Sequence, residues 1–125
     1  MKIRVLASDD FRKKAKPLLK KYISLKKELT ELRKQLEINP KLGICLGDGL
    51  YKIKVGVKSK GKGKSGGVRV ITYFVSKIQV VEAEEFKAVH LATIYDKSEY
   101  DTITDKGQKS IIKEIDEEFG YDLVE

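Results

Sequence analysis

The sequence predicts a single α+β domain over residues 1–125, in which a helical hairpin packs on a small, largely antiparallel sheet and a helix follows at the C-terminus. Two periodicities lead to this prediction. Apolar residues recur every three or four positions in residues 8–38 and 104–119, as on one face of a helix. They alternate with polar residues in the strands predicted between residues 50 and 95. A chain of 125 residues is long enough to bury a core without disulfides or metal.

The chain is expected to begin with an edge strand, because residues 1–6 are too short and too soon charged to be a signal peptide. Ser8, Asp9 and Asp10 then supply N-cap candidates for a first helix. Its apolar face consists of Phe11, Ala15, Leu18, Leu19 and Tyr22. Pro17 lacks the backbone donor that a helix interior needs, so we expect it to distort this helix or delay its regular start.

A second helix is predicted to start after Ser24 and to end at Asn39 and Pro40. Its leucines form one stripe: Leu25, Leu29, Leu32 and Leu36. The stripe lasts barely two heptads, which favours a place in the core over a dimer-forming coiled coil. The two helices are therefore expected to form an antiparallel hairpin that covers a sheet.

Three strands are predicted after a glycine-rich break. Residues 50–58 alternate strictly, with Tyr51, Ile53, Val55 and Val57 on one face and lysines on the other. Further strands are expected at 68–76 and 87–95. The intervening segment, 76–86, is interpreted as a turn region with at most a short strand at 78–81.

The C-terminal segment from Thr104 to Phe119 predicts an acidic amphipathic helix that Gly120 ends. The predicted order of elements is β-α-α-β-β-β-α. Neither an internal repeat nor a second domain is indicated.

Charge is segregated along the chain. The net charge is +7, yet residues 49–81 hold eight cations and no carboxylate, whereas residues 82–125 hold five cations and 13 carboxylates. A basic central segment of this kind indicates a polyphosphate or nucleic-acid partner. The alternative is a solvated hairpin tip whose lysines only protect a sheet edge.

The glycine-lysine run at residues 58–67 is the centre of this basic segment. A Walker phosphate loop is excluded, because Lys58 stands where its first glycine is required and a strand, not a helix, follows. The spacing of Gly61, Gly63, Gly66 and Val68 fits the nucleotide-binding hairpin of kinases, but the other kinase sequences are missing from this short chain.

Four segments, residues 39–43, 49–54, 59–73 and 91–99, resemble the RelE/ParE superfamily of type II toxin–antitoxin toxins, and its HigB/RelE-like branch in particular. The resemblance implies a RelE-like fold and a ribosome-dependent endoribonuclease, or mRNA interferase, that cleaves translated mRNA. It also implies a cognate antitoxin, often one with a helix-turn-helix DNA-binding domain. It carries catalytic roles onto Arg69, Lys54 and the segment from Tyr95 to Lys97.

The residues themselves suit metal-independent RNA cleavage. Attack of a ribose 2′-hydroxyl on its 3′-phosphate needs a base, neutralisation of the phosphorane and a proton for the leaving oxygen. Arg69 is the candidate clamp on the phosphoryl oxygens. Lys52 and Lys54 share a strand face, where mutual repulsion favours the neutral form of one lysine and makes it a candidate base. Tyr95 is a candidate for stacking on a base, and Lys97 for protonating the leaving oxygen.

The alternatives without a catalytic role are a packed aromatic at Tyr95 and a solvated sheet face at Lys52 and Lys54. His90 lies among apolar residues and is interpreted as a core or rim residue rather than an acid–base catalyst. Contacts with RNA or the ribosome, without a part in the chemistry, are expected from Lys58, Lys60, Lys62, Lys64 and Tyr73.

The remaining expectations concern compartment and rival functions. The single Cys45 and single His90 exclude an internal disulfide and a conventional zinc cluster, so we expect a reduced, cytoplasmic setting with no metal or cofactor and no membrane. The expected partners are the antitoxin, the ribosome and mRNA. Two rival functions remain open: a ParE-like inhibitor of DNA gyrase, and a nucleic-acid-binding domain without catalysis.

Overall fold

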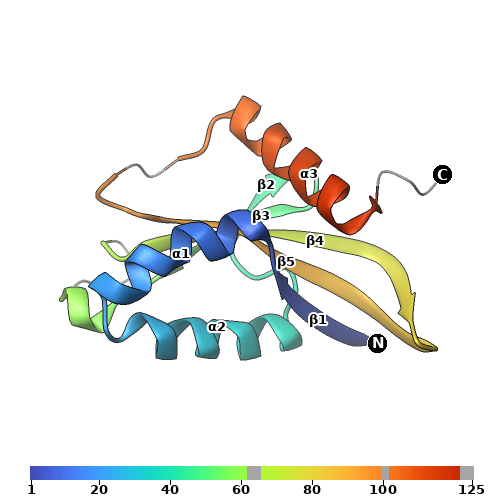
Figure 1. Ribbon diagram of the computed structural model, residues 1–125, viewed down its shortest axis with the longest axis horizontal. Coiled ribbons are helices and arrows are strands. Elements are labelled where there is room, and N and C mark those ends of the chain that lie inside the picture. The colour runs from blue at the N-terminus through green and yellow to red at the C-terminus, as the bar shows by residue number, and fades with distance from the viewer. Residues whose placement is uncertain (62–65, 100–101, 122–125) are drawn as a thin grey trace.

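The computed structural model describes residues 1–61, 66–99 and 102–121. It is an α+β fold in which one sheet is covered by helices on both faces (Figure 1). The sheet order is β1-β5-β4-β3-β2, from strands β1 (Lys2–Ala7), β2 (Ile44–Gly47), β3 (Leu50–Val55), β4 (Val68–Val81) and β5 (Glu84–Asp96). Strand β1 lies at the edge, as predicted, and runs parallel to β5, whereas the other neighbours are antiparallel.

The two N-terminal helices cover one face of the sheet, as the sequence predicts. They are α1 (Asp9–Lys21) and α2 (Leu25–Ile38), and they pack below the sheet in Figure 1. Ser8 caps α1 by accepting a hydrogen bond from the backbone N–H of Phe11 at 3.2 Å. The predicted delay at Pro17 is wrong, because α1 begins directly after Ser8 and continues through the proline.

The apolar faces of both helices enter the main core. The three most buried leucines of α2, Leu25, Leu32 and Leu36, pack with α1 and with one face of the sheet. The leucine stripe is therefore core, as expected. Burial of such a stripe contributes about 1.5–3 kcal/mol per fully buried side chain, which explains why these short helices are held on the sheet.

The third helix, α3 (Asp105–Phe119), packs on the opposite face of the sheet (Figure 1). Thr104 caps its first turn by accepting a hydrogen bond from Gly107 N–H at 3.1 Å, and Gly120, at φ 76°, ends it in the left-handed region. A second, smaller apolar cluster lies under α3. It contains Leu50, Ile71, Ala92, Tyr95 and Ile115.

The strand predictions need three corrections. A fifth strand, β2, pairs with β3. Strand β3 ends at Val55, and residues 58–60 form a 3₁₀ turn. The predicted turn region at 76–86 is largely strand, because β4 and β5 continue to a tight turn at Glu82 and Ala83.

Within the described part of the chain, no helix is both long and apolar enough to cross a lipid bilayer.

Candidate functional site

Three of the residues that the sequence singles out lie in one row across the sheet. Lys54 of β3 is opposite Arg69 of β4, and Arg69 is opposite Tyr95 of β5. Directly opposite residues of antiparallel strands share a face, so the three side chains start from the same side of the sheet. It is the side that α3 covers further along the strands, because Ile71 and Tyr95 belong to the cluster under α3.

Within the row, solvent exposure is high at Lys54 and low at Arg69 and Tyr95. Lys54 is exposed, whereas Arg69 and Tyr95 are only 1% and 3% exposed. The expectation that Tyr95 stacks on a base gains no support, since its ring packs in the cluster under α3. Lys52 and Lys97 are half-buried, and Lys97 follows β5 in a turn.

Arg69 is buried, although a clamp on phosphoryl oxygens has to reach its substrate. Its Nη1 lies 3.4 Å from the carbonyl oxygen of Val68. A buried guanidinium keeps its charge, because arginine does not lose its proton in proteins. Arg69 is therefore a fixed positive charge beneath the surface, beside the exposed ammonium of Lys54.

The base of the glycine-lysine run is clamped to the end of β5. The Nζ of Lys60 lies 2.5 Å from Oδ1 of Asp96, and the two side chains are only 13% and 2% exposed. Asp96 also accepts hydrogen bonds from the hydroxyl of Tyr22 at 2.5 Å and from both N–H and Oγ of Ser98 at 2.9 Å. On the far side of the run, Gly67 accepts a hydrogen bond from Lys97 N–H at 3.1 Å.

This network corrects the role predicted for Lys60. Its ammonium is bound to Asp96, so it is a structural anchor rather than an RNA contact. Lys58 is exposed, and its backbone N–H donates to Oε2 of Glu28 at 2.8 Å. Lys62 and Lys64 lie outside the described residues.

The Asp96 carboxylate is held in its charged form by its partners. Burial raises its pKa, but the hydrogen bonds from Lys60, Tyr22 and Ser98 outweigh burial and bring the pKa well below its usual range. Sequence reasoning included Asp96 only within the segment from Tyr95 to Lys97 and gave it no role of its own. The available signal was a carboxylate directly after the mostly apolar residues 88–95.

Tyr73 does not fit the RNA-binding role predicted for it. It is half-buried under α3, and its hydroxyl donates to Oδ1 of Asp116 at 3.2 Å. Burial, followed by the charge and hydrogen bond of Asp116, raises the pKa of Tyr73 to about 12. The residue ties α3 to the sheet.

His90 is a core residue, as the sequence interpretation favoured. It is fully buried, its ring lies 4.3 Å from that of Phe119, and its Nε2 is 2.6 Å from the hydroxyl of Tyr121. Within the part of the chain that is described, its Nδ1 has no hydrogen-bond partner. Burial lowers the pKa of His90 to about 4.

We expect this histidine to make the fold sensitive to mild acid. Between pH 6.5 and about 4, His90 binds a proton in the unfolded chain but not in the folded chain. The free energy of unfolding therefore falls as the pH falls. At about 1.4 kcal/mol per pH unit, the loss reaches about 3 kcal/mol. His90→Phe should flatten the profile of urea midpoint against pH in this window. Since the chain has one histidine, an unchanged profile would contradict the assignment.

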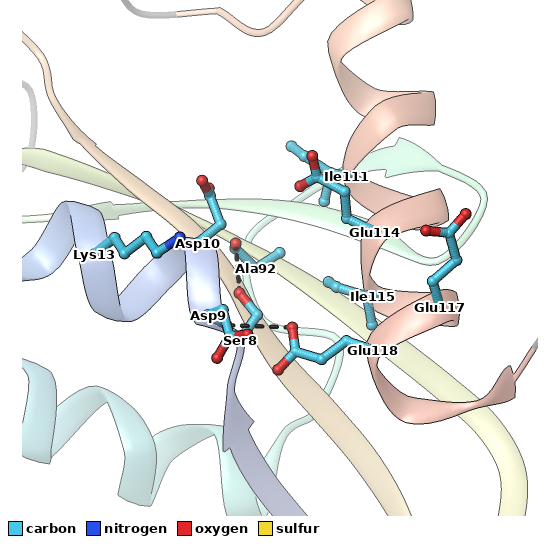
Figure 2. Close-up of a pocket in the computed structure, with 10 residues that line it drawn as sticks. All are labelled: Ser8, Asp9, Asp10, Lys13, Ala92, Ile111, Glu114, Ile115, Glu117 and Glu118. Atoms are coloured by element: carbon cyan, nitrogen blue, oxygen red, sulfur yellow. Dashed lines mark hydrogen bonds between the residues drawn. The ribbon is translucent and has the colours of Figure 1, made fainter.

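The cavity in Figure 2 lies between the start of α1 and α3 and has a volume of about 470 Å³. Glu118 of α3 extends toward α1 and accepts a hydrogen bond from Asp9 N–H at 3.2 Å. The lining carries five carboxylates and one lysine: Asp9, Asp10, Glu114, Glu117, Glu118 and Lys13. This charge repels phosphate, and no sequence-predicted site residue lines the cavity.

A smaller cavity, of about 390 Å³, connects Tyr95 with α1. Its cationic lining was missed by sequence reasoning and consists of Lys13, Lys14 and Lys21. All three lysines are exposed, Lys14 is paired with Asp10 at 3.3 Å, and Glu99 also lines the cavity. The only signal in the sequence was the dense charge on the outer face of the first helix.

Among the described residues, no group of three histidine, cysteine, aspartate or glutamate side chains is placed to hold a metal ion. The groups that the row and its surroundings offer to an anion are ammonium and guanidinium groups. No protein-family model matches this chain.

Proposed function

We propose that this protein is a cytoplasmic RelE-like toxin of a type II toxin–antitoxin pair, a ribosome-dependent and metal-independent endoribonuclease. The observation that carries the proposal is the row of Lys54, Arg69 and Tyr95 on three neighbouring strands. The row lies within or beside a segment, residues 49–81, that has eight cations and no carboxylate. Such a surface suits a polyanionic substrate.

In the proposed reaction, Arg69 neutralises the phosphoryl oxygens while the 2′-hydroxyl attacks. Lys54 accepts the proton of the attacking hydroxyl. Lys97 supplies a proton to the leaving oxygen. Tyr95 positions Arg69 by packing beside it, which replaces the stacking role. Because Arg69 is buried in the free protein, this mechanism requires the site to open when the ribosome presents the RNA.

The proposal is tested by adding the purified protein to a translating extract with a defined mRNA and mapping the products by primer extension. We expect new 5′ ends within the translated region, and none when the same mRNA is incubated without ribosomes. A gyrase inhibitor would instead leave the mRNA intact and block supercoiling of a plasmid. Intact mRNA in the translating extract would contradict the proposal.

Lys58, Lys62 and Lys64 of the glycine-lysine run are expected to anchor ribosomal RNA. Changing Lys58, Lys62 and Lys64 to glutamine should lower the log–log salt slope of ribosome binding by about one unit per lost phosphate contact. Lys60 is left unchanged, because its ammonium holds Asp96.

A matched control changes three exposed helix lysines, Lys20, Lys26 and Lys27, to glutamine. Both triple variants lose three positive charges. If the run contacts ribosomal RNA, only the variant with changes in the run should have a smaller salt slope. Equal losses would show that overall charge, not the run, sets ribosome binding. A lower cleavage rate with an unchanged salt slope would show that the run takes part in catalysis.

A further inference from the structure

Only part of the outer edge of β3 pairs with another strand. Strand β2 pairs with β3 from Leu50 to Lys52 and no further, so in the described chain no strand pairs with this edge beyond Lys52. Phe74 N–H donates to Gly49 C=O. In an antiparallel pair, every second residue of a strand turns its backbone N–H and C=O to the neighbouring strand, so Ile53 and Val55 turn theirs to β4. The N–H and C=O of Lys54 consequently point to the open side.

This open edge forms one wall of a groove of about 640 Å³, which β3 and the next residue line with residues 52–56. The opposite wall is α2, with buried Leu32 and exposed Ile38, and the loop after α2 closes one end with Leu42. Each residue of a strand advances about 3.3 Å, so the open edge, the three residues 53–55, is about 10 Å long. The groove is mainly apolar, although Glu28, Glu31 and Gln35 of α2 also line it, and its β3 side offers the backbone of Lys54, with which no strand of the described residues pairs on that side.

The alternation of β3 specifies what the next strand should carry. Ile53 and Val55 face the core under α2, whereas Lys54 faces the other side and is exposed. Cross-strand neighbours on one face stabilise each other when they match in polarity or have opposite charge. A residue opposite Lys54 should be acidic, and the residues on either side of it should be apolar.

We propose that the groove binds an extended segment of a partner protein that carries an apolar–acidic–apolar sequence and pairs as an added strand with β3 at Lys54. Backbone hydrogen bonds at Lys54 fix the register, the apolar side chains enter the groove beside Leu32 and Val55, and the carboxylate pairs with the Lys54 ammonium. The docking follows from the edge and the groove alone. Its consequence, that the bound carboxylate blocks the candidate base of RNA cleavage, rests on the proposed function.

The probe is a fluorescent eight-residue peptide with valine, glutamate and valine at its centre and threonine elsewhere, and binding is followed by anisotropy without RNA. We expect saturable binding that Lys54→Glu weakens by about five- to tenfold, the range for loss of one cross-strand charge pair and its replacement by repulsion. A peptide with lysine in place of glutamate should restore binding to that variant. Lys26→Glu, at an exposed position on α2 that does not line the groove, should leave the affinity unchanged.

Backbone pairing is tested separately by amide exchange, in which the Lys54 N–H should become protected when the peptide is bound. A peptide with the glutamate moved by one position, or with a methylated central amide, should bind more weakly. Three results would overturn the proposal: no binding at millimolar peptide, equal binding of the displaced-glutamate peptide, or a concentration-dependent dimer that protects Lys54 without peptide. Binding of the peptide by a protein that fails to cleave mRNA would reject the proposed function and leave the docking site standing.

Discussion

Arg69→Lys is expected to lower the rate of ribosome-dependent mRNA cleavage by about 10²- to 10³-fold, the range for removing one preorganised group that stabilises transition-state charge. Lysine keeps the positive charge and most of the stem, but it loses the planar fork that binds two phosphoryl oxygens. The loss should appear in kcat with KM nearly unchanged, because the clamp acts on charge that develops in the transition state. Single-turnover cleavage on stalled ribosomes separates the two quantities.

The burial of Arg69 determines which substitutions are informative. Arg69→Ala removes a long side chain from a position that is 1% exposed, so inactivity of that variant would not separate chemistry from packing. Arg69→Met fills a similar volume without charge and should be inactive yet folded. Tyr95→Phe keeps the packed ring and should retain activity, if Tyr95 only positions Arg69. A folded Arg69→Lys or Arg69→Met protein that cleaves at the wild-type rate would remove Arg69 from the site.

Sequence periodicity predicted the elements that have one buried face. The faces of α1, α2 and α3 were each identified, because burial on one side leaves an apolar stripe in the sequence. The outer part of the β4–β5 hairpin was predicted only in part, as a short strand at 78–81 within a turn region. Ile78, Val80 and Val81 are all exposed there, so the apolar residues of this part do not mark a buried face. Its turn uses Glu82 and Ala83 at positive φ, without the glycine or asparagine that signals a hairpin.

The sequence predicted which residues form the candidate site but not which of them are buried or paired. Alternation placed Lys54 and Arg69 on strand faces, and pairing brought them together. No local pattern distinguishes Lys60 from the other lysines of the run, because each is flanked by glycine or serine. Its different role comes from Asp96, 36 residues away in the sequence, which the fold places beside it. Contacts at that separation depend on tertiary structure.

Asp96→Ala is expected to destabilise the fold by about 3–5 kcal/mol, the range for removing one partner of a buried ion pair. The ammonium of Lys60, whose side chain is 13% exposed, would be left without its carboxylate, and the hydroxyl of Tyr22 would lose its acceptor. Urea denaturation at pH 7 measures the loss. Asp10→Ala is the matched control, because it removes the partner of Lys14 in an exposed pair that is worth about 0–1 kcal/mol.

The pH dependence separates the charge of Asp96 from its packing. Because the folded pKa lies below that of the unfolded chain, the carboxylate contributes its full stability above about pH 4, the unfolded value, and the contribution falls as the pH drops toward the folded pKa. Asp96→Asn should therefore approach the stability of the wild type below pH 4, after a large difference at pH 7. The asparagine keeps the shape of the side chain, so a difference that stayed constant with pH would assign the effect to packing. In that case the lysine–aspartate clamp would not be what holds the base of the glycine-lysine run against β5.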